Sequence, residues 1–172
     1  IRRLTRAQIA NQEIIVFKPT IDSRYTHEPK VVSHNGTEID SVVTSSIKEV
    51  LDKAQDYDVI GIDEIQFFGD GDRHLTVTEV LNILADTEKR VIVTGLDTDF
   101  AGKPFKPVND IMAIAEKVDK LTAICTKCNQ LATRTQRIID GKPAHEDSPL
   151  ILVGAQENYE ARCRKHHILK TN

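Results

Sequence analysis

The chain has 172 residues, a formal net charge of −3 at pH 7 and a sequence pI near 6.1, which suits one ordinary domain with a small appendage. Such a weakly acidic chain has no bulk attraction to nucleic acid or membranes, and the sequence contains no bilayer-length apolar stretch and no signal-peptide pattern. Its three cysteines, two of them in Cys-x-x-Cys, favour a metal in a reducing compartment over disulfides, so we expect a cytoplasmic protein.

Helices and short buried strands alternate from the start of the chain. Residues 1–12 predict a helix that has already begun, and residues 13–17 predict a buried strand. The polar segment 20–45 predicts mostly loop, with a short strand at Val31 and Val32. A capping box at residues 46–49 begins the next helix. The apolar run 59–62 is too short for a helix and predicts a strand buried on both faces.

The same alternation continues to residue 124. A second capping box at residues 76–79 begins a helix whose apolar face is Val77, Val80, Leu81 and Leu84, and residues 91–94 predict a third strand. Pro104 and Pro107 bracket a connection to a helix with Ile111, Ile114, Ala115 and Val118 as its apolar face. Residues 121–124 predict a fourth strand. Alternating strands and helices predict an α/β fold with a parallel sheet and helices on both faces.

Two carboxylates, Asp63 and Glu64, follow the strand at 59–62. At the carboxyl end of a parallel strand they would lie in the crevice where open α/β sheets bind ligands. Successive strand side chains point in opposite directions, so we expect the two acids to serve different sides of that crevice. One could hold a metal while the other accepts a proton; the alternative is a solvated acid pair that caps a core strand.

The last fifty residues predict a zinc site. Cys125-x-x-Cys128 and Cys163-x-x-His166 form two matched pairs, and three thiolates with one imidazole make a closed tetrahedral set typical of structural zinc. His167 is the rival fourth ligand, and the alternative is a thioredoxin-like redox pair beside an unrelated Cys and His. We therefore divide the chain into an α/β domain at 1–124 and a zinc-binding domain at 125–172, in which the hairpin between the pairs is either a lid or an ordinary zinc-ribbon hairpin.

Several ordered motifs together resemble one enzyme family. They are Lys18-Pro-x-x-Asp-x-Arg-Tyr25, Asp63-Glu-x-Gln-Phe-Phe68, Gly95-Leu-Asp-x-Asp-Phe100, Ala132-Thr-Arg-Thr-Gln-Arg137 and Gly154-Ala-x-Glu-x-Tyr159, with the two cysteine pairs. With these motifs the chain resembles the cellular-type (type II) thymidine kinases, in a bacterial-like form. The resemblance implies a P-loop, RecA-like domain with a zinc-held lasso domain in a homotetramer. It implies transfer of the γ-phosphate of MgATP to the 5′-hydroxyl of thymidine or deoxyuridine in nucleoside salvage.

The resemblance also assigns residues to roles. Glu64 falls on the catalytic base and Asp63 on the acid that serves Mg²⁺. The ATP site would comprise Asp22, Ser23, Arg24, Asp63, Glu64, Ile65 and Gln66. The nucleoside site would comprise Phe100, Leu150, Ile151, Leu152, Val153, Gly154 and Tyr159. From the residues alone Phe100 could equally be a core side chain, whereas the polar tip of Tyr159 favours a site role.

One departure from the family pattern is the phosphate-binding G-x-x-x-x-G-K-[ST] loop, which is not in this sequence. We expect that loop and the strand before it to precede residue 1 in the native protein. Two other classes stay open. One is a RecA-like ATPase with a structural zinc. The other is a zinc-ribbon module that binds nucleic acid or protein through the basic residues Arg134, Arg137, Arg162, Arg164 and Lys165, although the net acidity argues against nucleic acid.

Overall fold

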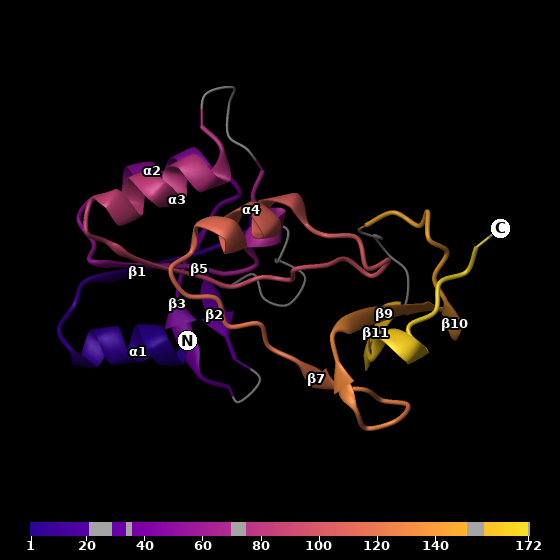
Figure 1. Ribbon diagram of the computed structural model, residues 1–172. Helices are drawn as coiled ribbons and strands as arrows, with labels where there is room; N and C mark the ends of the chain where they lie inside the picture. The colour runs from indigo at the N-terminus through magenta and orange to yellow at the C-terminus, as the bar shows by residue number, and fades with distance from the viewer. Residues whose placement is uncertain (21–28, 34–35, 70–74, 151–156, 172) are drawn as a thin grey trace. The chain divides into compact units, whose positions relative to one another are not determined.

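The computed structural model describes residues 1–20, 29–33, 36–69, 75–150 and 157–171 (Figure 1). By its internal contacts the chain divides into two compact units. The first contains residues 1–96 and 106–114, and the second contains residues 97–105 and 115–172. This grouping joins residues 97–105 to the zinc-binding part of the chain; the sequence-based boundary after residue 124 stays a prediction.

A four-stranded parallel sheet forms the centre of the first unit. Its strand order is β4 (Val42–Val43), β1 (Ile14–Lys18), β5 (Val59–Ile62) and β6 (Arg90–Val93). Phe17 pairs with Ile62, which pairs with Val93, so the carboxyl ends of β1, β5 and β6 are level at one edge. All four residues of β5 are buried, as expected for a strand covered on both faces. The predicted parallel α/β sheet is confirmed.

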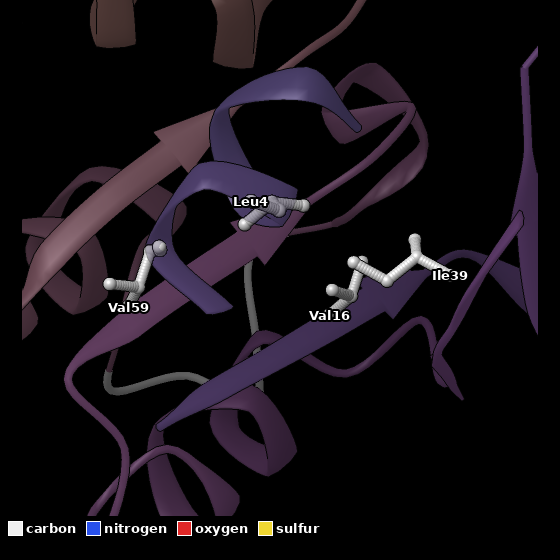
Figure 2. Packing of buried hydrophobic residues seen from close by; sticks show 5 residues of the cluster. Leu4, Val16, Ile39 and Val59 are labelled. Carbon is white, nitrogen blue, oxygen red and sulfur yellow. The ribbon is translucent and has the colours of Figure 1, made fainter. Parts of the chain in front are cut away.

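Helices cover both faces of this sheet (Figure 1). On one side lie α2 (Ile47–Lys53) and α3 (Val77–Asp86), which contact each other, and α1 (Arg2–Ile9) lies on the other. In Figure 2, Leu4 of α1 lies over the strands that carry Val16 and Val59, and Ile39 completes the apolar cluster. Gly61 lets α1 approach closely, because a Cβ there would lie 2.9 Å from a methyl carbon of Leu4.

Local sequence signals explain where the helices begin. At α3 the capping box is complete: the Thr76 side chain accepts a hydrogen bond from Glu79 N, and the Glu79 carboxylate accepts one from Thr76 N. The four residues of its predicted apolar face are all buried. At α2, Ser46 caps Glu49 N as predicted, but the Glu49 carboxylate instead accepts hydrogen bonds from Thr44 and Lys53. Thr44 Oγ1 in turn accepts from Ser46 N.

Two predicted elements differ from the structure. The predicted fourth sheet strand at 121–124 is wrong: β7 (Ala123–Ile124) pairs antiparallel with β8 (Leu131–Ala132) in the second unit, and Leu121 is 86% exposed. The fourth strand of the parallel sheet is β4, whose two residues are too few to show a periodic pattern. The α4 helix (Lys106–Ile114) begins earlier than predicted, with Pro107 in its first turn, where a missing N–H costs little. Ala115 and Val118 lie beyond its end.

The remaining elements are short. A β2 (Lys30–Val32) and β3 (Glu38–Asp40) hairpin lies within the segment predicted to be mostly loop, and the short helix η2 (Ile65–Phe67) follows β5. In the second unit, β9 (Arg134–Ile139) pairs antiparallel with β10 (Lys142–Pro143) and β11 (Glu157–Arg162), and η3 (Arg164–His166) follows. Among the described residues, the helices are too short or too polar to cross a bilayer.

Candidate functional site

The two acids lie directly beyond the carboxyl end of β5. Asp63 N donates to Phe17 O at 2.9 Å, which extends the sheet ladder by one residue. The Asp63 carboxylate is held on one oxygen: Oδ1 accepts from the Thr94 hydroxyl and from Glu64 N at 3.1 Å. Thr94 follows the last residue of β6, so two neighbouring strand ends fix this carboxylate. The hydroxyl of Thr94 is a site contact that the sequence did not reveal.

Glu64 leaves the strand in a left-handed backbone conformation. Its φ of 49° and ψ of 45° cost an L-residue roughly 1–2 kcal/mol, and such residues cluster at functional sites. The expectation that the two acids alternate as strand residues is therefore wrong, because strand geometry ends at Ile62. The acids still differ in surroundings: Glu64 Oε2 accepts from Gln66 Nε2 at 2.5 Å, and both carboxylates are only partly buried.

Gln66 holds Glu64 in relation to the end of β6. Its amide is buried, with Nε2 on the Glu64 carboxylate and Oε1 accepting from Leu96 N at 3.1 Å. Gly95 makes room for this amide, because a Cβ there would lie 2.5 Å from Gln66 Oε1. A partly exposed carboxylate that a buried amide orients can accept a proton from a hydroxyl within hydrogen-bond reach.

A second group of residues converges in the second unit. The ligand atoms of Cys125, Cys128, Cys163 and His166 all lie within 4.8 Å of one another. Cys128 Sγ lies 3.7 Å from Cys163 Sγ, and His166 Nδ1 lies 3.4 Å from Cys163 Sγ and 3.7 Å from Cys125 Sγ. A tetrahedral zinc ion with ordinary bond lengths places sulfurs about 3.8 Å apart and sulfur and nitrogen about 3.5 Å apart. These side chains therefore fit zinc in both type and spacing.

The thiol environments also suit a metal. Burial raises the pKa of Cys125, but backbone N–H groups of Cys163, Lys127 and Cys128 together with the His166 ring outweigh it and lower that pKa to about 5. The Gln130 N–H lowers the pKa of Cys128, yet burial and the two neighbouring thiols outweigh it and raise that pKa. Cys125 is thus a thiolate at neutral pH, and Cys128 would be deprotonated when the metal binds.

Arg162 joins the two cysteine pairs. Its Nε donates to Thr126 Oγ1 at 2.9 Å, its Nη1 donates to His166 O at 3.3 Å, and its Nη2 forms an ion pair with Glu160. Arg162 and then Thr126 lower the pKa of Glu160 through hydrogen bonds. Thr126 lies between Cys125 and Cys128, and His166 belongs to the second pair. Arg162 therefore links both ligand pairs as an outer-shell residue.

His166 completes the cluster, whereas its rival His167 has another partner. The imidazole Nε2 of His167 lies 2.7 Å from the Phe100 carbonyl oxygen, and since a carbonyl can only accept, Nε2 is the donor. Phe100 itself is 5% exposed. The guanidinium carbon of the fully buried Arg137 lies 4.9 Å from the Phe100 ring centre and 5.9 Å from that of Tyr159, which is half exposed.

The remaining predicted site residues are only partly described. Leu150 is exposed, and Tyr159 lies on β11 opposite Arg137 of β9. Asp22, Ser23, Arg24, Ile151, Leu152, Val153 and Gly154 lie outside the described residues. In the basic patch of the alternative nucleic-acid module, Arg137 and Arg162 are buried, so that patch loses two of its five members.

A comparison with known families covers both groups of residues. A family model described as "Thymidine kinase" matches residues 1–167, which is nearly the whole chain. The match spans both the acids beyond β5 and the Cys3His cluster, and it implies a phosphotransferase that acts on a nucleoside. The chain therefore belongs to the thymidine kinase family.

Proposed function

We propose that this protein is an ATP-dependent thymidine kinase that transfers the γ-phosphate of ATP to the 5′-hydroxyl of thymidine or deoxyuridine in cytoplasmic pyrimidine deoxynucleoside salvage. The position and contacts of Glu64 are the observation that supports this proposal most. In a family that phosphorylates a nucleoside, this carboxylate lies beyond the carboxyl end of a central parallel strand, in a strained conformation, with a buried amide holding one oxygen.

Glu64 would act as the general base. Phosphoryl transfer needs positioning and charge neutralisation more than covalent help, and a carboxylate in hydrogen-bond reach accepts the hydroxyl proton as the new P–O bond forms. Gln66 donates to Glu64 Oε2 and so orients the carboxylate that would accept the proton. Asp63, held on Oδ1 by Thr94, would serve a hydrated Mg²⁺ that neutralises phosphate charge. The rest of the proposed ATP site is Asp22, Ser23, Arg24, Ile65 and Gln66.

The proposed nucleoside contacts are residues of the second unit. They are Phe100, Leu150, Ile151, Leu152, Val153, Gly154 and Tyr159. Backbone groups that read the base discriminate sharply, because a wrong base leaves them unpaired. Zinc held by the Cys3His cluster would be structural, since four protein ligands complete a tetrahedral set. We propose a homotetramer as the assembled form.

The test is turnover of thymidine by the full-length native protein with MgATP. Glu64→Gln keeps an acceptor for the Gln66 amide but removes the base, so we expect turnover to fall by about 10²–10⁴-fold while thymidine affinity stays within a few-fold. Glu116→Gln, at an exposed glutamate, is the matched control and should behave as wild type. Wild-type turnover in Glu64→Gln would refute the assignment, and ADP release that does not depend on thymidine would indicate an ATPase instead.

A further inference from the structure

The turn at residues 97–105 is packed as part of the zinc-binding unit, although in sequence it follows the parallel sheet. We propose that His167 and Arg137 are positioning residues that fix Phe100 for nucleoside binding. The inference rests on the proposed function, because Phe100 is a nucleoside contact only there.

The turn is well ordered by its own hydrogen bonds. Thr98 and Pro104 form an antiparallel bridge, and the Asp99 carboxylate accepts from Ala101 N at 2.9 Å and from Lys103 N at 2.8 Å. Asp99 N also donates to Lys103 O at 2.9 Å. Phe100 lies within this closed turn, so a contact that fixes Phe100 fixes the turn as a body.

His167 holds the backbone of Phe100 from an anchored position. Its own backbone N donates to Cys163 O at 3.1 Å. The next residue, Ile168, is bound twice by the buried Gln136 side chain, which accepts from Ile168 N and donates to Ile168 O, both at 2.8 Å. The imidazole that reaches Phe100 O at 2.7 Å therefore projects from a backbone fixed on both sides.

Arg137 holds the ring of the same residue. The guanidinium lies over Phe100 at 4.9 Å in a buried setting, where cation–π attraction is strongest, and it also lies near Tyr159 of the neighbouring strand. Its Nη1 donates to Pro149 O at 2.5 Å. One buried side chain thus contacts both proposed nucleoside aromatics and the residue before Leu150, another proposed nucleoside contact.

The two contacts act on different parts of Phe100, and this gives the residue one orientation before ligand binds. A preorganised contact loses less conformational freedom on binding, so removing one hold should weaken nucleoside binding and leave the phosphate-transfer chemistry nearly intact. The net free energy of one hydrogen bond corresponds to about a three- to tenfold change in affinity.

The test compares four variants of the full-length zinc-loaded protein. His167→Leu removes the donor, whereas His167→Gln places an amide N–H near the position of Nε2 and is the conservative rescue. His145→Leu, at a partly buried histidine of the same unit, is the matched control. We expect His167→Leu to raise the KM for thymidine about three- to tenfold with kcat and the KM for ATP nearly unchanged, and the other two to stay near wild type. Arg137→Lys, which keeps the charge but loses the planar group, should also raise that KM.

A second measurement does not depend on activity. Amide hydrogen exchange of residues 97–105 should become faster in His167→Leu and in Arg137→Lys, at unchanged zinc content per chain, and stay slow in His167→Gln. Wild-type exchange and wild-type KM in both His167→Leu and Arg137→Lys would overturn the inference. If the wild-type protein does not phosphorylate thymidine, the proposed function fails, while the exchange data still decide whether these two residues hold Phe100.

Discussion

Gly95→Ala should impair the proposed base, Glu64, although Glu64 itself is unchanged. A Cβ at residue 95 would lie 2.5 Å from Gln66 Oε1 and 2.9 Å from Ile65 Cγ2, well inside the roughly 3.5 Å separation of nonbonded atoms. Ile65 is buried beside this amide. The Gln66 amide must therefore move by about 1 Å, which breaks its hydrogen bonds to Leu96 N and to the Glu64 carboxylate.

Gly95→Ala should reduce both the stability of the protein and its turnover. Overpacking a buried site costs about 1–3 kcal/mol, and the lost Leu96 hydrogen bond adds about 1 kcal/mol, so we expect a loss of about 2–4 kcal/mol in the free energy of unfolding. A misplacement of about 1 Å in a reacting group can reduce turnover about 10²-fold. We expect that loss in kcat of thymidine phosphorylation, with urea unfolding as the stability assay.

Two comparisons make the test specific. Gly69→Ala is the matched control in the same unit, because a Cβ there would meet no described atom within 4 Å, and it should stay within about 0.5 kcal/mol of wild type. Adding Gln66→Ala to Gly95→Ala removes the clashing amide and should recover part of the stability but not the turnover. A Gly95→Ala protein with wild-type stability and kcat would refute this account of how Glu64 is held.

Further predictions concern the α3 cap and the metal centre. Thr76→Ala should lower the free energy of unfolding by about 1 kcal/mol in urea melts at pH 7. Hydrogen bonds from the backbone N–H and then the side chain of Thr76 lower the pKa of Glu79, so the stabilisation that comes from ionised Glu79 is present above the ordinary glutamate pKa and is lost as pH falls through the lowered value. Thr76→Ala removes only the side-chain hydrogen bond to this carboxylate, so the gap in stability between wild type and Thr76→Ala should shrink in part in acid, and a gap that does not shrink would contradict this. Arg162→Gln should weaken zinc binding about 10–100-fold in chelator competition, with Arg164→Gln, at an exposed arginine, as control.

Local patterns in the sequence were enough to determine much of this protein. The parallel sheet and most of its helices are predicted by the capping box at Thr76, the buried strand at 59–62 and the alternation of strands and helices. These signals depend only on residues that are close in sequence, within one or two helical turns. The paired spacing of Cys125, Cys128, Cys163 and His166 likewise predicts a ligand set that the fold brings together. The motif order pointed to the family that the comparison identifies.

The tertiary structure alone decided which strand completes the sheet and how the site residues are supported. Val42 and Val43 join the sheet through pairing with β1, and Ala123 and Ile124 pair elsewhere, because short apolar segments carry no signal for their partner. The links from Gln66 to Leu96, from His167 to Phe100 and from Arg137 to Pro149 join residues distant in sequence. A polar side chain in a sequence does not show whether it will be buried or what it will bind; that depends on the packing of elements that only the folded chain brings together.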